Sequence, residues 1–232
     1  MRTRNFVVAA LTPLFALAAC DTVELVEPGG TPTTGGTATV RFVNATGTGL
    51  DIAQSGVVGT GMSNITYGGS TSCFTVNANS PALSVRNTGT TTALSGLTTN
   101  FASNGSYTVL AYPDASGTTR FAVLPNVYTP ATGQAGLRVF NATTGTYDIY
   151  TAALGGSFVT PSATAVAAGS TSNFFNVTPG TGAQLRISNA GTTTSALTLN
   201  NLTWTAGQTQ TLVIAPPVAG STTLRTFLVS GC

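Results

Sequence analysis

The chain contains no histidine and no lysine, and charged residues make up only 6% of its 232 residues. Histidine is the usual general acid or base at neutral pH, and lysine is a frequent nucleophile. Beyond residue 37 the acidic residues are few and widely spaced: Asp51, Asp114 and Asp148. A glycosidase-like pair of carboxylates forms only if the fold brings distant acids together. We therefore expect a protein that is not an enzyme.

The sequence also lacks the ligand clusters that bind zinc or calcium, because its cysteines and acids are scarce and scattered. Serine and threonine are abundant, but none lies in a G-x-S-x-G or S-x-x-K motif that would indicate an activated nucleophile. We expect no metal site and no cofactor.

Charge is balanced as well as sparse. The formal net charge is +2, but Arg2 and Arg4 lie at the extreme N-terminus, and the arginines and acids of the remaining chain are equal in number. Such a chain has no basic patch, so nucleic acid is not an expected partner. Its surface must be hydrated mainly by hydroxyl and amide groups, which predicts a stability that changes little with salt or across neutral pH.

Cysteine is rare, and the first of the three follows a basic start and an apolar stretch typical of an export signal. The segment Leu17-Ala18-Ala19-Cys20 resembles the bacterial lipobox, in which the cysteine thiol receives a diacylglycerol. This predicts a lipoprotein signal peptide over residues 1–19 and lipidation of Cys20. Ordinary secretion and an uncleaved membrane span are the alternatives.

The lipobox resemblance implies a lipid-anchored protein of the bacterial cell envelope, on the outer membrane or the periplasmic face, with the leaflet left open. Residues 20–37 are rich in glycine, proline and threonine and show no periodic apolar face. This composition is typical of a flexible linker. The membrane, reached through the lipid anchor, is therefore the first expected partner.

The rest of the chain consists of short apolar runs, such as TVRFV, YTVLAY, GLRVF and QTLVIA, bounded by Gly, Asn, Thr or Pro. Runs of this length, rich in β-branched and aromatic residues, are typical of strands. No window of ten or more residues keeps a helical period without glycine or proline. The predicted fold class is all-β.

Two halves of this region resemble each other. The run VRFVNA at Val40 matches LRVFNA at Leu137, and LSVRNTGTTTAL at Leu83 matches LRISNAGTTTSAL at Leu185. The matches keep their order along the chain, which indicates a tandem repeat.

The repeat divides the chain into a first domain over residues 38–130, a linker over 131–135 and a second domain over 136–232. About 95 residues with roughly seven short strands suit a Greek-key, immunoglobulin-like β-sandwich, although a barrel has the same periodicity. We expect two such sandwiches.

Each half places an arginine ten residues before an aspartate: Arg41 before Asp51, and Arg138 before Asp148. A hairpin would bring each pair face to face across neighbouring strands, where opposite charges contribute up to about 1 kcal/mol. We predict two structural ion pairs, with ligand binding as the alternative role.

The two remaining cysteines, Cys73 and Cys232, predict a disulfide between the first domain and the end of the chain, because the cell envelope is oxidising. Two free buried thiols are the alternative. The pairing is not part of the repeat, since Cys73 aligns with Asn173.

The pattern Arg-x-x-Asn-Ala followed by Asp-Ile opens both halves. It comprises Arg41, Asn44, Ala45, Asp51 and Ile52, and again Arg138, Asn141, Ala142, Asp148, Ile149 and Tyr150. This pattern resembles the start of the bacterial family catalogued as domain of unknown function 4397. The resemblance implies exported, often lipid-anchored tandem β-sandwiches, and it implies no activity.

We expect a non-catalytic structural or adhesive surface module. One alternative is a self-assembling surface or filament subunit, because uncharged strand edges pair readily with other chains. Another is a carbohydrate-binding module that stacks sugars on aromatic residues. The candidate aromatic residues are Tyr112, Tyr128, Tyr147, Tyr150 and Trp204.

Overall fold

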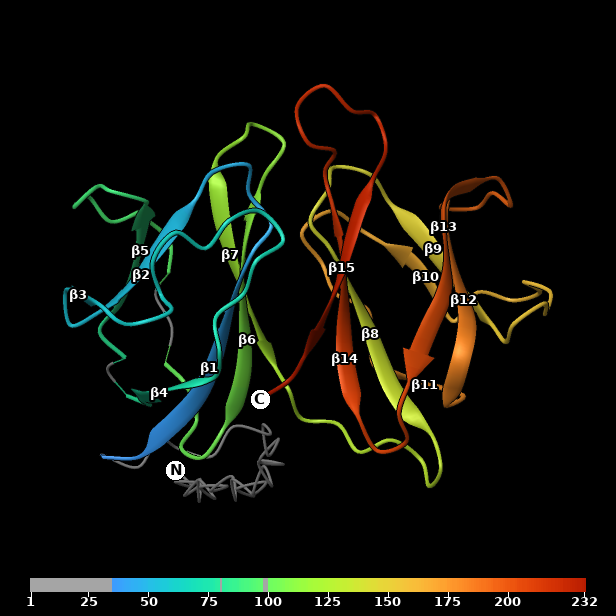
Figure 1. The fold of residues 1–232 in the computed structure, drawn as a ribbon, viewed down its shortest axis with the longest axis horizontal. Helices are drawn as coiled ribbons and strands as arrows, with labels where there is room; N and C mark the ends of the chain where they lie inside the picture. The colour runs from blue at the N-terminus through green and yellow to red at the C-terminus, as the bar shows by residue number, and fades with distance from the viewer. Residues whose placement is uncertain (1–34, 80, 98–99) are drawn as a thin grey trace, which may run out of the picture.

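The computed structural model describes residues 35–79, 81–97 and 100–232, and every helix or strand element in these ranges is a β-strand. The predicted signal peptide, Cys20 and most of the predicted linker lie outside the described residues. The strands form four sheets, which Figure 1 shows as two sandwiches side by side. The predicted all-β class and sandwich architecture are confirmed.

The first sandwich combines a four-stranded sheet, in the order β4-β1-β6-β7, with a three-stranded sheet, in the order β3-β2-β5. Strand β1 pairs antiparallel with β4 and parallel with β6, and the sequence did not predict the parallel pairing. The strands are β1 (Thr37–Asn44), β2 (Leu50–Gln54), β3 (Val57–Val58), β4 (Phe74–Asn77), β5 (Leu83–Asn87), β6 (Ser106–Pro113) and β7 (Thr119–Pro125).

The second sandwich has two four-stranded sheets, in the orders β11-β8-β14-β15 and β10-β9-β12-β13. Strand β8 pairs antiparallel with β11 and parallel with β14, as β1 does with β4 and β6. The strands are β8 (Ala135–Asn141), β9 (Tyr147–Ala152), β10 (Ala163–Val166), β11 (Phe175–Val177), β12 (Gly180–Asn189), β13 (Ser195–Trp204), β14 (Thr209–Ala215) and β15 (Arg225–Ser230).

Each sandwich has its own core between its two sheets. In the first, alternate residues of β1 such as Val40 and Phe42 meet Ile52 and Val85 of the opposite sheet. In the second, Leu137 and other residues of β8 meet the inner residues of β9 and β12. Burying one such aliphatic or aromatic side chain contributes about 1.5–3 kcal/mol, so period-two alternation selects the inner face of each strand.

A third apolar cluster lies between the β4-β1-β6-β7 sheet of the first sandwich and the β11-β8-β14-β15 sheet of the second, and we call it the junction. Here the alternate residues that face away from the cores are also buried. Strand β8 is consequently buried at every position. The junction consists of Val43, Ala45, Leu110, Leu124, Phe140, Ala142, Val213, Ala215 and Val229.

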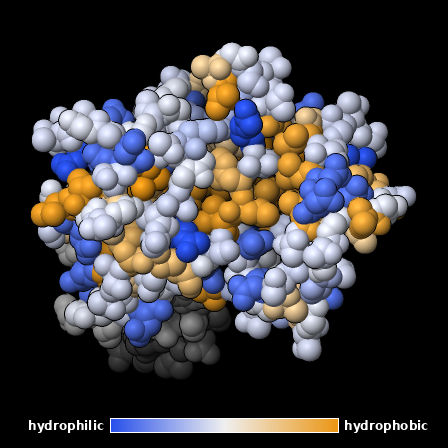
Figure 2. Space-filling view, in the orientation of Figure 1, coloured by the Kyte–Doolittle hydropathy of each residue, from blue (hydrophilic) through white to orange (hydrophobic). Residues whose placement is uncertain are grey.

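The molecule is therefore four sheets deep, with the β4-β1-β6-β7 and β11-β8-β14-β15 sheets in the middle. Figure 1 shows β6 and β7 of the first sandwich facing β14 and β15 of the second. Figure 2 shows apolar residues along the seam between the two halves, while much of the remaining visible surface has intermediate hydropathy. The sparse charge of the sequence thus gives a surface dominated by neutral residues.

Strands β1 and β2 do not form the hairpin that the sequence predicted. Strand β1 lies in the sheet that faces the junction, and β2 lies in the outer sheet with β3 and β5. The same separation holds for β8 and β9. The turn after Asn44 therefore connects the two layers of a sandwich and does not connect neighbouring strands of one sheet.

Candidate functional site at the junction of the two sandwiches

The asparagine of the repeated pattern fixes the turn between layers. Asn44 Nδ2 donates to the carbonyl oxygens of Thr48 and Ile65, both at 2.7 Å, and its Oδ1 accepts from the amide and hydroxyl of Thr46. Asn141 is equally buried and repeats this arrangement. A buried side chain whose amide groups are all paired holds local backbone in a single conformation.

The contacts of Asn141 match those of Asn44 one by one. Its Nδ2 donates to the carbonyl oxygens of Gly145 and Val166, and its Oδ1 accepts from the amide and hydroxyl of Thr143. The asparagine therefore serves the fold in both sandwiches.

The aspartates also bind backbone, and the predicted ion pairs do not form. Asp51 accepts hydrogen bonds from the Asn64 amide at 2.7 Å and the Gly89 amide at 3.2 Å. Asp148 accepts from the amides of Ala165 and Gly191, both at 2.8 Å. The prediction of Arg41–Asp51 and Arg138–Asp148 pairs was wrong, because the two members of each pair stand in different sheets.

The hydrogen bonds of Asp51 affect its ionisation. The amide of Asn64 makes the largest contribution and lowers the pKa of Asp51 below its ordinary value of 3.8, against the opposing effect of burial. Arg86 stands opposite Asp51 in the sheet and its charge lowers the pKa further. The ionised carboxylate is therefore the form that fixes the two loops.

The arginines of the pattern reach across the junction. Arg41, on β1, donates from Nη1 to the carbonyl oxygen of Ser230 at 2.7 Å, at the end of β15 in the second sandwich. Its Nη2 lies 3.4 Å from the sulfur of Cys73. Arg41, which belongs to the first sandwich, therefore binds the second sandwich.

Arg138, on β8, makes the corresponding contact in the opposite direction. Its Nη1 donates to the carbonyl oxygen of Pro125 at 2.7 Å, and its Nη2 donates to Asn126 Oδ1 at 2.8 Å, both in the first sandwich. Its Nε donates to Thr211 at 2.9 Å. The side chain is buried, and this burial lowers the pKa of Arg138 to about 10, which leaves it charged at neutral pH.

The two carbonyl acceptors occupy corresponding positions. Pro125 is the register partner of Tyr107, which pairs with Val40, and Ser230 is the register partner of Gln210, which pairs with Leu137. Each arginine thus donates to the same point on the last strand of the other sandwich. Reciprocal contacts of this kind characterise an isologous interface, here formed within one chain.

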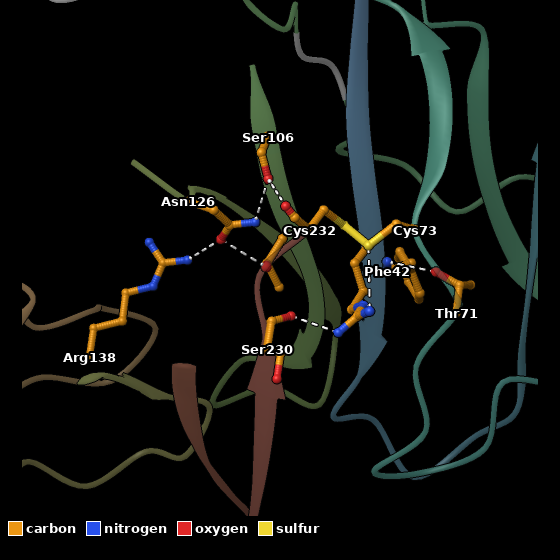
Figure 3. The surroundings of a disulfide bond; sticks show 10 residues. Phe42, Thr71, Cys73, Ser106, Asn126, Arg138, Ser230 and Cys232 are labelled. Atoms are coloured by element: carbon orange, nitrogen blue, oxygen red, sulfur yellow. Dashed lines mark hydrogen bonds between the residues drawn. A yellow bond between two sulfur atoms is a disulfide. The ribbon is translucent and has the colours of Figure 1, made fainter. Parts of the chain in front are cut away.

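A disulfide joins the sandwiches beside the arginines. Cys73, just before β4, is bonded to Cys232, with their Cα atoms 5.8 Å apart. Figure 3 shows a hydrogen-bonded chain from Arg138 through Asn126 and Ser106 to the carbonyl oxygen of Cys232. Side-chain hydrogen bonds thus connect Arg138 to the covalent link.

On the opposite side of the junction an aromatic stack takes the place of the disulfide. The rings of Tyr128 and Phe174 lie parallel, 4.7 Å apart, and Arg138 lies 4.6 Å above Phe174. Gly136 permits this packing, since a Cβ there would lie 2.7 Å from the Tyr128 ring.

The strand registers show that Cys73 corresponds to Phe174 and not to Asn173. Val40 pairs with Phe74, and the matching Leu137 pairs with Phe175, so the position before each is Cys73 or Phe174. The alignment made from the sequence was one residue out of register here. The segment between β9 and β11 is one residue longer, relative to the segment between β2 and β4, than the alignment allowed, and short runs of Ser and Thr conceal the shift.

The five aromatic residues considered for sugar stacking do not form one exposed platform. Tyr147 and Trp204 belong to the second core. Tyr112 packs edge to face on Phe140 at the junction, and Tyr128 stacks on Phe174. Tyr150 is buried under Arg186. Packing uses these rings, and they do not form together the platform that was considered as an alternative.

The described residues contain few arrangements suited to chemistry. No group of three or more His, Cys, Asp or Glu side chains in these ranges is placed to bind a metal ion. The ion pair found there joins Arg120 to Asp114 at 2.8 Å on the surface. A hollow of about 210 Å³ opens beside Trp204 and is lined by neutral residues such as Thr151 and Asn176.

No helix in the described ranges is long and apolar enough to cross a membrane.

Sequence reasoning missed the junction, although a signal for it was present. Strands that cover only one core alternate between apolar and polar residues, whereas strands buried on both faces are apolar throughout. The runs Val109-Leu110-Ala111 and Leu212-Val213-Ile214-Ala215 are of the second kind. Both strands lie in the sheets that form the junction.

Comparison with protein-family models gives a match that begins in the first sandwich and ends in the second. A search of curated proteins finds no match. The matched family model covers the first sandwich and continues through β8 and β9 of the second, so it includes both copies of the arginine, asparagine and aspartate pattern. Residues 38–152 match the family described as Domain of unknown function (DUF4397).

Proposed function

We propose that this protein is a non-catalytic lipoprotein of the bacterial cell envelope, in which two copies of one repeated β-sandwich form a structural or adhesive surface module. The observation that carries the proposal is the use of the repeated polar residues. Arg41 and Arg138 hold the opposite sandwich, and the repeated asparagines and aspartates hold backbone. The residues that the two halves share therefore have structural roles, as a rigid module requires.

The anchor is part of the proposal. Cys20, within the lipobox-like segment, carries the lipid, and residues 20–37 connect it to β1, which begins at Thr37. The two sandwiches are then held close to the membrane surface.

The junction suits a module that must transmit force or present a fixed surface. Flexible two-domain proteins usually have small, polar contacts between domains. Here the contact has an apolar centre, two buried or half-buried arginines and a disulfide. We infer that the two sandwiches act as one body.

The proposal is tested in cells that express either the full chain or its Cys20→Ser variant. The full chain should incorporate a labelled fatty acid, fractionate with membranes and increase cell attachment to surfaces or resistance to detergent. The variant should lose the label and the effect. Mature protein without lipid would contradict the anchor, and identical attachment and detergent resistance in both strains would contradict the surface role.

A second candidate function, self-assembly, is favoured by the free edge of β13. This strand spans ten residues, Ser195–Trp204, and contains neither charge nor proline. It is the last strand of its sheet, and its pairing with β12 contains register shifts, but it carries none of the charges that block pairing of an edge strand with another chain. Sedimentation of the wild type and of Ala196→Lys tests this. Concentration-dependent association that the lysine abolishes would support assembly, and a monomer at all concentrations would exclude it.

A further inference from the structure

Arg186 lies in the middle of β12, on the face of the outer sheet that points away from the core. Its neighbours across the sheet are Tyr150 on β9 and Thr198 on β13. The residues before and after it, Leu185 and Ile187, both enter the core. Strand alternation therefore presents Arg186 on the outer surface of the second sandwich.

The guanidinium of Arg186 is held between two aromatic rings. Its central carbon lies 4.2 Å from the centroid of Tyr150 and 4.8 Å from that of Phe158. Rings on the guanidinium faces restrict its rotation and leave its N–H edge as the part that binds other groups. The orientation of this fork is therefore fixed before any ligand arrives.

Arg186 has no anionic partner among the described residues. It makes no hydrogen bond or ion pair there, and its Nε is buried without an acceptor. Asp148, the acid on the neighbouring strand, already accepts from the amides of Ala165 and Gly191. An arginine that is oriented but not neutralised is a ready binding site for an oxyanion, which accepts hydrogen bonds from its N–H groups.

The fold does not require this arrangement. In the first sandwich the register places Ser84 at the position of Arg186, and Ala53 at that of Tyr150. The first sandwich completes its outer sheet without a stacked arginine. The residues that the two halves share stabilise the fold. The cluster of Arg186, Tyr150 and Phe158 is not shared, so it is available for binding.

Neutral hydrogen-bonding groups surround Arg186 on the same face. Thr198 is its cross-strand neighbour, and Gln184 donates to Asn200 at 2.8 Å one pair further along the two strands. Side chains of this kind bind sugar hydroxyls, while a guanidinium binds a carboxylate through two parallel hydrogen bonds.

We propose that the outer face of β12 and β13 binds an acidic polysaccharide, with Arg186 gripping a carboxylate of a uronic acid residue. Tyr150 and Phe158 act as positioning residues that hold the guanidinium, and Thr198 and the Gln184–Asn200 pair contact neighbouring hydroxyls. The inference rests on the adhesive role proposed above and gives that role a ligand class.

Calorimetric titration of the purified protein, with its disulfide intact, tests the inference with three oligosaccharides at physiological salt. These are a galacturonic acid tetramer, a neutral glucose tetramer and a sulfated galactose tetramer. We expect binding of the galacturonic acid tetramer and no binding of the neutral one. Preference for the sulfated or the neutral oligosaccharide would overturn the proposal.

Two variants assign the binding to Arg186. Arg186→Gln should weaken binding of the galacturonic acid tetramer by about tenfold or more, because the fork is lost. Arg225→Gln removes an exposed arginine on another sheet, which faces Tyr67 and forms no ion pair among the described residues, and it should change binding less than about twofold. Equal loss in both variants would show nonspecific attraction and overturn the assignment.

Phe158→Leu keeps the charge but removes one ring of the stack. It should weaken binding by about threefold and leave the unfolding temperature close to that of the wild type, which separates loss of positioning from loss of folding. If no acidic oligosaccharide binds while attachment of cells still depends on Cys20, the ligand class is wrong and the surface role stands.

Discussion

Arg41 and Arg138 stand at the same position of corresponding strands, and each donates at 2.7 Å to a backbone carbonyl at the end of the other sandwich's last strand. Their acceptors, Ser230 and Pro125, also correspond in register. The two arginines therefore form one reciprocal clasp, and the apolar junction fills the space beside it.

The two halves of the clasp should differ in strength. Arg138 is buried and makes three hydrogen bonds, so Arg138→Met leaves several acceptors unpaired and should cost about 2–4 kcal/mol of unfolding free energy. Arg41 is half-buried and donates to one carbonyl, so Arg41→Met should cost about 1 kcal/mol. Urea unfolding measures both, with Arg225→Met as an exposed control. Equal costs for Arg138 and Arg41 would contradict the clasp as described.

Reduction of the disulfide should destabilise the protein without unfolding it. The link between Cys73 and Cys232 spans 159 residues, and a loop of that size is worth about 5 kcal/mol in the chain-entropy model and often less in practice. The junction and both cores remain after reduction. Thermal unfolding of the wild type and of the double variant Cys73→Ser, Cys232→Ser should show a clear drop in Tm with native circular dichroism below it. An unchanged Tm would show that the bond adds nothing.

Stability should stay level from about pH 5 to pH 8, because the chain has no histidine to titrate. The pKa of Asp51 is lowered in the folded state, first by the Asn64 amide. Its ionised form therefore stabilises the fold above the unfolded-state pKa, which is close to the ordinary value of 3.8, and that contribution is lost as the pH falls through the folded-state pKa. Hydrogen bonds from Ser116 and Arg120 lower the pKa of Asp114 in the same direction.

The loss of unfolding free energy at acid pH, which we call the acid limb, tests this prediction. Asp51→Asn should reduce the loss of unfolding free energy between about pH 5 and pH 2, and it should lower stability at pH 7 by about 1–2 kcal/mol because one set of backbone amides loses a charged acceptor. A transition between pH 5 and pH 8, or an acid limb that is unchanged in this variant, would refute the assignment.

The buried asparagines should be of equal importance. Asn44→Ala and Asn141→Ala each remove a side chain that satisfies two carbonyl oxygens, an amide and a hydroxyl, so each should cost about 2–4 kcal/mol. Chemical unfolding of both variants measures this. A large loss of unfolding free energy in one variant and none in the other would show that the two turns are not stabilised in the same way.

Much of the architecture could be predicted from local sequence. Short β-branched runs bounded by glycine and asparagine predicted strands, and the all-β class follows from them. The repeated Arg, Asn and Asp residues were singled out, but the partners predicted for Arg and Asp were wrong. Cross-strand pairing depends on which sheet each strand joins, and alternation along Val40–Asn44 is the same in a hairpin as in a crossover between layers.

The contacts between sandwiches could not be derived from spacing. Arg41 reaches a residue 189 positions away, and the acceptor is a backbone carbonyl that any residue provides. The stacked Arg186 also escaped notice, because Phe158 lies outside the strands and has no fixed spacing from β12. Long-range partners of this kind leave no local pattern, whereas the doubly buried runs of β6 and β14 did indicate a covered outer face.

The central claim is that a reciprocal arginine clasp and an apolar junction make two sandwiches into one body. Differential scanning calorimetry of the oxidised protein tests it most directly. The account predicts a single transition whose calorimetric and van't Hoff enthalpies agree for the whole chain. Two resolved transitions, each with the enthalpy of about one sandwich, would contradict it.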